Sequence, residues 1–381
     1  MNIVHITLSG AYTEGMSYQD NFLTTQNLMD GHKTMIIANC TVFQNGELVP
    51  VPPCDKILDN GLRLVRLPYE YFLTGFLAGK IRRVRGLYKL LEDFAPEVIL
   101  SHSLSYWSAL DVIRYKKNHS EVKLYADTHT AAYNSGRNWL SLHVLHRGLY
   151  RYLIQKTLPY LEKYFYIGEA ERQFSVQNYG VPESLMEFYP LGGTLLPEEE
   201  YKVVRSKRRA ELGLAEGTAL LIHSGKLDSL KRTDALLRSF TAVPGLDARL
   251  VVIGSIPEDR KELLMSLIEA DKRVVYLGWK SGAELQEYLC ACDLYCQPGG
   301  VSATMQNAVC RGCAILSAPH EAYTVNLDYG NFLWVKTEEE MSAVFRQLQE
   351  DPELLDPLRE DSRRCARELL DYRKLAARLY Q

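Results

Sequence analysis

The sequence predicts an α/β protein with two doubly wound parallel sheets. Short apolar runs rich in β-branched residues alternate with longer amphipathic stretches along most of the 381-residue chain, as strand–helix–strand units require. The alternation restarts after Tyr189–Gly193, where Pro and Gly cluster, and a chain of this length suggests two domains. We therefore expect two domains, 1–189 and 190–365, facing each other across a cleft that binds a small molecule, followed by a helical segment, 366–381.

Composition narrows the classes of partner. The chain is 46% hydrophobic and 24% charged, which is typical of soluble globular proteins, and its net charge of −3 argues against nucleic acid as a partner. The first residues, Met1–Ile6, enter a strand pattern without a basic leader, and no apolar stretch approaches the roughly 20 residues of a membrane span. We therefore expect a cytoplasmic protein with its cysteines reduced.

Five of the eight cysteines lie close together in the sequence: Cys290, Cys292, Cys296, Cys310 and Cys313. A zinc site would be one interpretation, but zinc spacing usually shows two clear pairs. The favoured interpretation is small apolar residues lining a buried sheet, so we expect no metal.

In the first half, apolar runs predict strands, and amphipathic stretches predict helices between them. The expected strands are 2–8, 33–38, 62–67, 97–101, 122–126 and 163–167, and the expected helices are 17–31, 69–91, 139–161 and 169–179. The loop after the first strand contains Gly15 and Met16. It either binds a sugar or phosphate acceptor or is a plain turn.

Polar residues follow two neighbouring strands of this half. His102 follows one strand, and Asp127–Thr130, which includes His129, follows the next. Ligands of open α/β sheets bind at the carboxyl ends of strands, so His129 is a candidate site residue, although a lone histidine is more often structural.

The segment 69–91 is aromatic first and then basic, with apolar residues at helical spacing and cations on the opposite face. It predicts either a helix on an anionic membrane surface or a surface helix with a solvated basic face.

The second half repeats the α/β pattern. The expected strands are 219–223, 249–253, 273–277, 293–297 and 314–318, and the expected helices are 229–240, 257–270, 282–291, 303–309 and the charged end of the chain, 338–381. Lys226 and Lys231 flank the start of a helix, where two ammonium groups can neutralise one diphosphate.

The stretch 292–319 organises this half. Pro298, Gly299 and Gly300 break a buried strand, and Ser302 is a candidate N-cap of the next helix. The amide N–H groups of 301–304 would then point at an anion such as a phosphate.

These motifs together resemble those of family 4 retaining glycosyltransferases with the GT-B fold, which has two Rossmann-like domains. G-K-L-D-S-L-K (225–231) resembles the family's G-R/K-x4-K element, and V-V-I-G-S (251–255) and V-V-Y-L-G-W (274–279) resemble its next two strand–glycine elements. The stretch 292–318 resembles its long signature ending in E-A-x-A-x-G-x-P-V, and L-M-D-G-H (28–32) resembles its start. The order of the motifs covers nearly the whole chain.

The resemblance implies a role for each matching residue. Lys226 and Lys231 would hold the diphosphate of a nucleotide sugar, His129 would reach the donor sugar, and the last helix, near 372–380, would pack back on the first domain. The remaining donor-side residues would be Gly225, Gly254, Gly278, Gly300, Ser302, Ala303, Thr304 and Asn307, and the acceptor-side residues Gly15 and Met16.

One departure concerns the family's E-x7-E motif, whose glutamates are replaced here by Gly299 and Asn307. Asn307 can still hydrogen-bond ribose hydroxyls without a charge, whereas Gly299 cannot replace the glutamate that contacts the donor sugar. The expected consequence is a reset sugar specificity, or a transfer that is weakened or absent.

The expected function is therefore retaining, metal-independent transfer of a hexosyl group from a nucleotide-diphosphate sugar, such as a UDP-sugar, to a glycan or lipid-linked acceptor. Cell-envelope polysaccharide synthesis at the inner face of the membrane would suit the basic-aromatic segments. The alternatives are a GT-B sugar-nucleotide epimerase or hydrolase, and a catalytically silent GT-B partner subunit.

Overall fold

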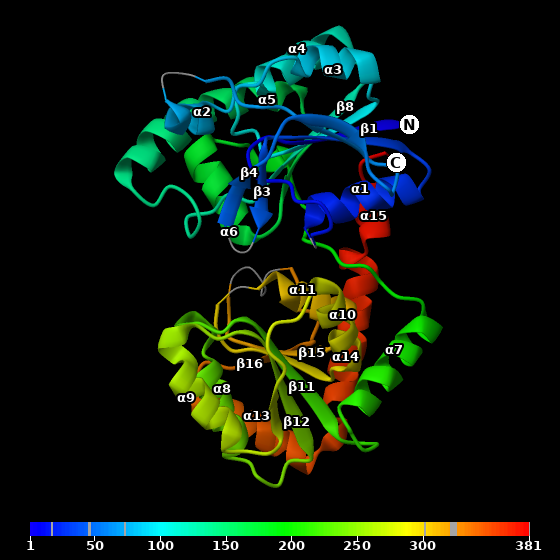
Figure 1. The fold of residues 1–381 in the computed structure, drawn as a ribbon, viewed down its shortest axis with the longest axis vertical. Helices are drawn as coiled ribbons and strands as arrows, with labels where there is room; N and C mark the ends of the chain where they lie inside the picture. Colours follow the sequence, from blue (N-terminus) through cyan, green and yellow to red (C-terminus); the bar gives the residue numbers. More distant parts are fainter. Residues whose placement is uncertain (17, 45–46, 72–73, 301, 321–325, 381) are drawn as a thin grey trace. The chain divides into compact units, whose positions relative to one another are not determined.

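The computed structural model describes residues 1–16, 18–44, 47–71, 74–300, 302–320 and 326–380 (Figure 1). The chain divides into two compact units: unit 1 comprises Met1–Pro190 and Tyr372–Gln381, and unit 2 comprises Leu191–Asp371. The limits predicted from the sequence were 189/190 and 365/366. None of the described helices has the length and hydrophobicity needed to cross a bilayer.

Unit 1 contains an eight-stranded sheet in the order β10-β9-β8-β7-β1-β2-β6-β5, parallel except for β5. The strand order reverses between β1 and β7, and ligands of doubly wound sheets bind at such a reversal. The strands are β1 (Asn2–Thr7), β2 (Lys33–Ala38), β5 (Cys54–Ile57), β6 (Arg63–Arg66), β7 (Val98–His102), β8 (Lys123–Thr128), β9 (Lys163–Tyr166) and β10 (Met186–Phe188), and a separate hairpin pairs β3 (Thr41–Gln44) with β4 (Glu47–Pro50).

Helices cover both faces of this sheet. One face packs against α3 (Leu87–Phe94), α4 (Ala109–Asn118), α5 (Arg151–Thr157) and α6 (Glu169–Phe174). The other packs against α1 (Gln19–Met29) and α15 (Tyr372–Ala377). The end of the chain is tied to this unit by the Tyr189 hydroxyl, which donates to the Leu375 carbonyl at 2.7 Å, and by stacking of Phe22 on Tyr372.

The prediction of one helix over 69–91 is wrong. The segment forms α2 (Gly75–Ile81) and then α3, because Arg82 and Gly86 between them adopt left-handed backbone conformations. Three of its cations are also engaged within the unit: Arg82 donates to the Ser105 carbonyl, and Arg83 and Arg85 pair with Glu70. The long helix predicted over 139–161 is present as the consecutive segments η1 (Ser141–Tyr150), α5 and η2 (Leu158–Tyr160).

Unit 2 contains a six-stranded parallel sheet in the order β13-β12-β11-β14-β15-β16, which reverses between β11 and β14. The strands are β11 (Ala219–Lys226), β12 (Ala248–Ser255), β13 (Val274–Tyr276), β14 (Leu294–Gln297), β15 (Ala314–Ser317) and β16 (Phe332–Trp334). Helices α8 (Thr233–Thr241), α9 (Glu258–Glu269) and α13 (Glu338–Glu350) cover one face. Helices α10 (Gly282–Ala291), α11 (Ala303–Cys310) and α14 (Leu355–Cys365) cover the other.

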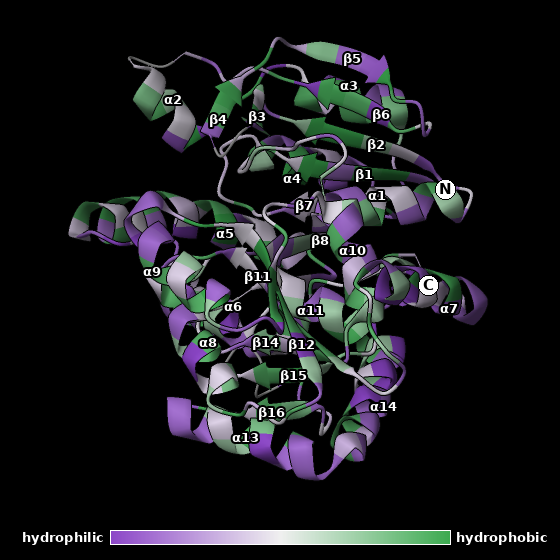
Figure 2. Ribbon diagram, turned by 60° about the horizontal axis from the view of Figure 1, so that its bottom comes forward, coloured by the Kyte–Doolittle hydropathy of each residue, from purple (hydrophilic) through white to green (hydrophobic). Residues whose placement is uncertain are grey.

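Helix α7 (Glu198–Glu211) opens this unit and packs against α10. Hydropathy follows the layers within each unit: in Figure 2, β2 and β11 are mainly green, whereas α13 and α14 are largely purple.

All eight cysteines are free, and the five clustered in the sequence are buried in the core of unit 2. Among the described residues, no cysteine belongs to a group of three or more side chains that could share a metal ion.

Two glycines let β11 and β12 approach closely at their carboxyl ends. Gly225 pairs with Gly254 in the parallel ladder, and both have positive φ, 132° and 141°. A Cβ atom on Gly254 would lie 1.8 Å from the Gly225 carbonyl oxygen, so no other residue fits there without moving the backbone.

We expect Gly254→Ala to lower the free energy of unfolding by at least about 3 kcal/mol, because it adds both overpacking and left-handed strain. Urea denaturation measures the change. Gly217→Ala is the matched control: Gly217 also has positive φ but faces open space, so it should cost only about 1 kcal/mol. Equal losses in the two variants would show that the close contact at Gly254 is unimportant.

Candidate functional site

The loops that follow β11 and β14 meet at the point where the strand order of unit 2 reverses. Their contact is backbone to backbone: a Cβ on Gly299 would lie 2.3 Å from the Leu230 carbonyl oxygen, and one on Gly300 would lie 3.5 Å from it. Gly300 is exposed and has a φ of 64°. The absence of a side chain at Gly299 therefore lets the two loops pack together at this edge.

The two predicted lysines differ in their surroundings. Lys231 is half-buried, and its Cε would lie 3.3 Å from a Cβ on Gly225. Burial lowers the pKa of its ammonium group below the ordinary value, with Asp228 opposing this effect. Lys226 is exposed at the end of β11. The structure thus brings Gly225 and Lys231 together beside the Gly299–Gly300 loop and puts Lys226 at the solvent side of its own loop.

Buried side chains of β14 make hydrogen bonds to the loop that follows this strand. The Gln297 amide donates to the carbonyls of Gly299 and Gly300. The Tyr295 hydroxyl lies 3.0 Å from Ser224 Oγ and also interacts with the side chains of Ser302 and Thr304, while burial raises the pKa of this tyrosine to about 12. A buried polar group must be hydrogen-bonded to avoid a desolvation cost, so these bonds define the loop conformation.

The predicted N-cap of α11, Ser302, does not make the capping hydrogen bond expected of it. Ser302 occupies the N-cap position of α11 with an extended backbone, but its side chain makes no capping hydrogen bond. Its hydroxyl is engaged with Tyr295 instead. Ala303 and Thr304 begin the helix, and Val301 lies outside the described residues.

His223, in β11, links β14 to the start of α8. Its Nδ1–H donates to the Cys296 carbonyl at 2.8 Å, and its Nε2 accepts from the Thr233 hydroxyl at 2.9 Å, where α8 begins. Complete burial lowers the pKa of His223 to about 4. The neutral imidazole is therefore the form that fits this position.

The other predicted glycine elements lie at the same edge of the sheet. The Gly254 N–H donates to the Gly278 carbonyl at 2.8 Å, and the Tyr276 hydroxyl donates to the Gly254 carbonyl at 2.8 Å. This links the loops that follow β12 and β13.

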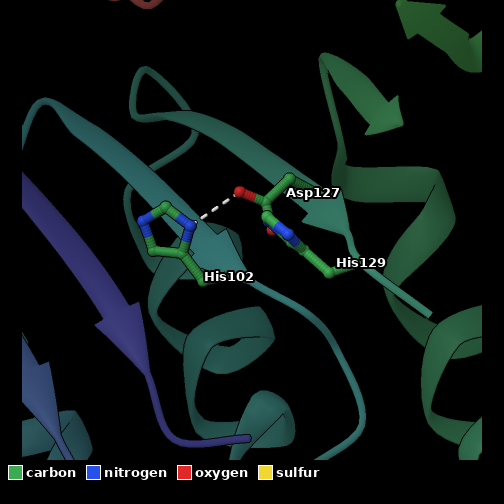
Figure 3. Close-up of side chains that lie close together, drawn as sticks. All are labelled: His102, Asp127 and His129. Carbon is green, nitrogen blue, oxygen red and sulfur yellow. Dashed lines mark hydrogen bonds and ion pairs between the residues drawn. The ribbon is translucent and has the colours of Figure 1, made fainter. Parts of the chain in front are cut away.

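Unit 1 holds a separate polar cluster where its own strands end. His102 ends β7, Asp127 lies near the end of β8, and His129 follows that strand. The Nδ1 of His102 lies 2.6 Å from Asp127 Oδ2, and the Nε2 of His129 lies 3.7 Å from Asp127 Oδ1 (Figure 3).

The cluster continues into the core through residues that the sequence analysis missed. His102 Nε2 lies 3.0 Å from His5 Nδ1, and His5 Nε2 lies 2.8 Å from Asn27 Oδ1. A signal was present, because His5 stands inside an otherwise apolar predicted strand, but its partners are 97 and 22 residues away.

Burial and charge act differently on these groups. Burial lowers the pKa of His5 to about 3. Burial also opposes the charge on His102, yet the Asp127 carboxylate raises the pKa of His102 above its ordinary value. Burial alone would raise the pKa of Asp127, but the two histidines beside it bring it well below its ordinary value.

Gly15 and Met16 lie in the loop after β1, distant in sequence from this cluster. Gly15 is exposed with a φ of 75°. The loop is anchored by Arg66, which donates to the Tyr12 carbonyl at 2.9 Å, and by Asn39, which donates to the Gly10 carbonyl at 2.8 Å.

The comparisons with known proteins identify the second unit. Residues 204–365 match the family model described as glycosyl transferases group 1. No curated protein matches the chain at a significant level of sequence similarity.

Solved structures of glycosyltransferases share the fold of the whole chain. The Anabaena protein HepE, crystallised with UDP, superposes with a TM-score of 0.68 at 14% identity, covering 99% of this chain and 98% of its own. A glycosyltransferase from Rickettsia africae gives 0.69 at 13% identity, with coverages of 99% and 96%. WaaG, a glycosyltransferase involved in lipopolysaccharide biosynthesis, gives 0.61 at 13% identity and covers both chains completely. The predicted GT-B fold and the resemblance on which it rested are confirmed.

Gly299, which the family resemblance places at the first glutamate of the E-x7-E motif, has no room for a side chain. Gly299 is buried, and a Cβ there would meet the Leu230 carbonyl oxygen at 2.3 Å and Arg232 Cγ at 2.9 Å. Arg232 itself is held by the carbonyls of Pro298 and Lys336. A glutamate cannot occupy this position in the observed loop conformation, whereas Asn307 is half-buried on α11.

The buried His223 generates a pH-dependent prediction. Its pKa is lowered from 6.5 to about 4, so its contribution is fully present above pH 6.5 and is lost as the pH falls toward 4, because only the unfolded state then binds the proton. As the pH falls from 6.5 to 4, we expect the wild type to lose about 3 kcal/mol of unfolding free energy relative to His223→Gln. Urea denaturation at several pH values measures it. Parallel curves for the two proteins would contradict the assignment.

Proposed function

We propose that this protein is a glycosyltransferase that moves a hexosyl group from a nucleotide-diphosphate sugar, such as a UDP-sugar, to an acceptor hydroxyl with retention of configuration. The observation that carries the proposal is the packing of the Gly225–Lys231 loop against Gly299–Gly300 at the strand-order reversal of unit 2. The family match of 204–365 supports it, as do crystal structures of the Anabaena relative with UDP and with UDP-glucose.

The proposed catalysis acts on the leaving group, where negative charge develops during transfer. Departure of the nucleoside diphosphate leaves negative charge on its phosphates, and preorganised cations and amides stabilise that charge. Lys231 acts from a half-buried position, where attraction to a phosphate is stronger than in water. Lys226 and the amide N–H groups at the start of α11 add to it, and the proposal requires no metal ion at the diphosphate.

Retention would arise from attack on the face from which the diphosphate leaves. A double displacement needs a carboxylate nucleophile. In the two loops, 225–232 and 298–300, the one carboxylate is that of Asp228, and it accepts a hydrogen bond from the Leu230 N–H. This favours same-face attack.

We expect Lys226→Ala and Lys231→Ala each to lower kcat/KM for transfer by at least about 100-fold, because each removes a cation from the leaving group. Both variants should also bind UDP more weakly in a calorimetric titration. The control is Lys272→Ala, since Lys272 is exposed just before β13, at the opposite end of its strand. Unchanged transfer in both loop variants, with intact folding, would remove these lysines from the site.

A catalytically silent subunit is the second candidate, and the buried Gly299 is the observation that favours it, because the position cannot hold a glutamate. A thermal-shift screen against a panel of nucleotide sugars separates the two. A ligand at 100 times its Kd stabilises the folded state by about 2.7 kcal/mol, so a donor-binding enzyme should show a clear rise in Tm. An epimerase or hydrolase would instead convert the nucleotide sugar without any acceptor.

For the acceptor, we propose a glycan or lipid-linked glycan at an anionic membrane surface, in cell-envelope polysaccharide synthesis. Unit 1 exposes large apolar side chains close in sequence to cations: Tyr71, Phe76, Trp139, Leu140 and Tyr152. Lys80 lies over the Phe76 ring and Lys156 over the Tyr152 ring. Aromatic and basic groups of this kind suit the interfacial region of a bilayer.

Flotation with vesicles containing anionic lipid tests this proposal at low salt. We expect Trp139→Ala and Phe76→Ala each to weaken binding by about tenfold, because burying a large apolar side chain contributes roughly 1.5–3 kcal/mol. Trp279→Ala is the control, since Trp279 is equally exposed but belongs to unit 2. Failure of the wild type to float would remove the membrane from the proposal and leave the transfer reaction untouched.

A further inference from the structure

One cation of the loop that follows β11 has no acidic partner. Arg232 comes directly after Lys231 and is half-buried at the start of α8. It forms no ion pair with any aspartate or glutamate that the structure describes. Arg238, further along the same helix, instead pairs with Glu338 at 2.7 Å and with Asp234 at 3.0 Å. Because partly buried charges normally have a partner, the unpaired Arg232 is suited to bind an anionic ligand.

The backbone of Arg232 adopts a conformation that favours glycine. Its φ of 53° and ψ of 36° lie in the left-handed region, where a residue with a Cβ atom is strained. Glycine would adopt the same conformation without this strain. Strained residues concentrate at functional sites, so the presence of an arginine here points to a role for its side chain.

The side chain of Arg232 fills the space beside Gly299. Its Cγ and Cδ would lie 2.9 and 3.2 Å from a Cβ atom on Gly299. Its Nη1 donates to the Pro298 carbonyl at 3.3 Å and to the Lys336 carbonyl at 2.9 Å. These two bonds hold the guanidinium in place, and its Nε and Nη2 have no partner among the described residues. The N–H groups of Nε and Nη2 form the planar pair of donors that matches a carboxylate.

Lys231 and Arg232 are neighbours in the sequence, but their side chains extend toward different strands. The Cε of Lys231 would lie 3.3 Å from a Cβ atom on Gly225, at the end of β11. Arg232 extends toward Pro298 and Lys336, which follow β14 and β16. In the sheet, β14 lies between β11 and β16. The two cations therefore face different parts of a ligand bound along this edge.

The chemistry of a nucleotide sugar limits what Arg232 could bind. The diphosphate carries the charge that Lys226 and Lys231 would neutralise, and a uridine nucleoside is uncharged at neutral pH. The sugar is the remaining part of the donor, and a hexose is anionic when its C6 is a carboxylate, as in a hexuronic acid. The loop 298–300 contains no acidic residue that would repel such a carboxylate.

We propose that Arg232 binds a carboxylate on the donor sugar, and that the donor is a nucleotide-diphosphate hexuronic acid such as UDP-glucuronic or UDP-galacturonic acid. The inference rests on the proposed transfer from a nucleotide sugar and gives that donor a chemical class. It also gives a physical basis for a reset sugar specificity. A glycine stands where the resembling family has a glutamate, and a cation fills the space beside it.

Calorimetric titration of the full chain tests the proposal with UDP, the two UDP-uronic acids, UDP-glucose and UDP-galactose. Each uronic acid is compared with its neutral hexose, from which it differs only at C6. We expect at least one uronic acid to bind about tenfold more tightly than its neutral hexose, because bidentate bonds between an arginine and a carboxylate are among the strong hydrogen bonds.

Two variants test the role of Arg232 in this preference. Arg232→Gly removes the cation and relieves the left-handed strain, and Arg232→Gln removes the charge but keeps most of the side chain. In both variants we expect the preference for the uronic acid to disappear, while the affinity for UDP itself stays unchanged. A purely structural role would alter the affinity for all ligands alike and leave their ratio as it was. Far-UV circular dichroism checks that each variant folds.

Arg238→Gln is the matched control, because it removes a cation of the same helix that Glu338 and Asp234 already neutralise. This variant should keep the wild-type preference. Three results would overturn the inference while leaving the proposed transfer intact: equal or weaker binding of both uronic acids by the wild type, an unchanged preference in the folded Arg232 variants, or loss of the preference in Arg238→Gln. Failure of UDP itself to bind would overturn both the inference and the proposed transfer.

Discussion

Close backbone packing at the carboxyl edge of the second sheet is the constraint on which the proposed donor site depends. Gly225 and Gly254 touch where β11 and β12 end, and Gly299 touches the Leu230 carbonyl where the next loop turns. Any side chain at Gly254 or Gly299 would separate these segments. Their absence lets the loops pack together beside the half-buried Lys231, where we propose that the diphosphate binds.

Polar groups buried beneath that surface keep the loops in place. Tyr295, Gln297 and His223 are buried in the strands β14 and β11, and each is hydrogen-bonded to protein atoms: Tyr295 to Ser224, Gln297 to the carbonyls of Gly299 and Gly300, and His223 to Cys296 and Thr233. A buried network of this kind costs free energy if any member loses its partner, so it favours a single loop conformation. The same network explains why Ser302 does not cap α11 with its side chain.

Unit 1 uses its strand ends differently. Instead of glycines and amides, it gathers histidines and a carboxylate, linked through His5 to Asn27 in the core. Because these groups are buried, their charges act on one another with little screening. The two units thus have the same sheet architecture, with a reversal of strand order in each, but different side chains follow the strands: two lysines in unit 2, and histidines with a carboxylate in unit 1.

The alternation of apolar runs and amphipathic helices, which is a local property, predicted the two α/β units from the sequence alone, and the resemblance of the motifs to those of a known family predicted the GT-B fold. It also located the loops with Lys226, Lys231 and Gly299. The sequence did not predict several short or partly exposed strands: β3, β4, β5, β10 and β16. Pairing with a neighbouring strand, rather than a pattern in their own residues, stabilises them. Only the tertiary structure decided that the 69–91 segment breaks at Arg82, that Arg232 and Leu230 fill the space beside Gly299, and that His5 joins His102. Each of these depends on contacts between residues far apart along the chain, on which local periodicity carries no information.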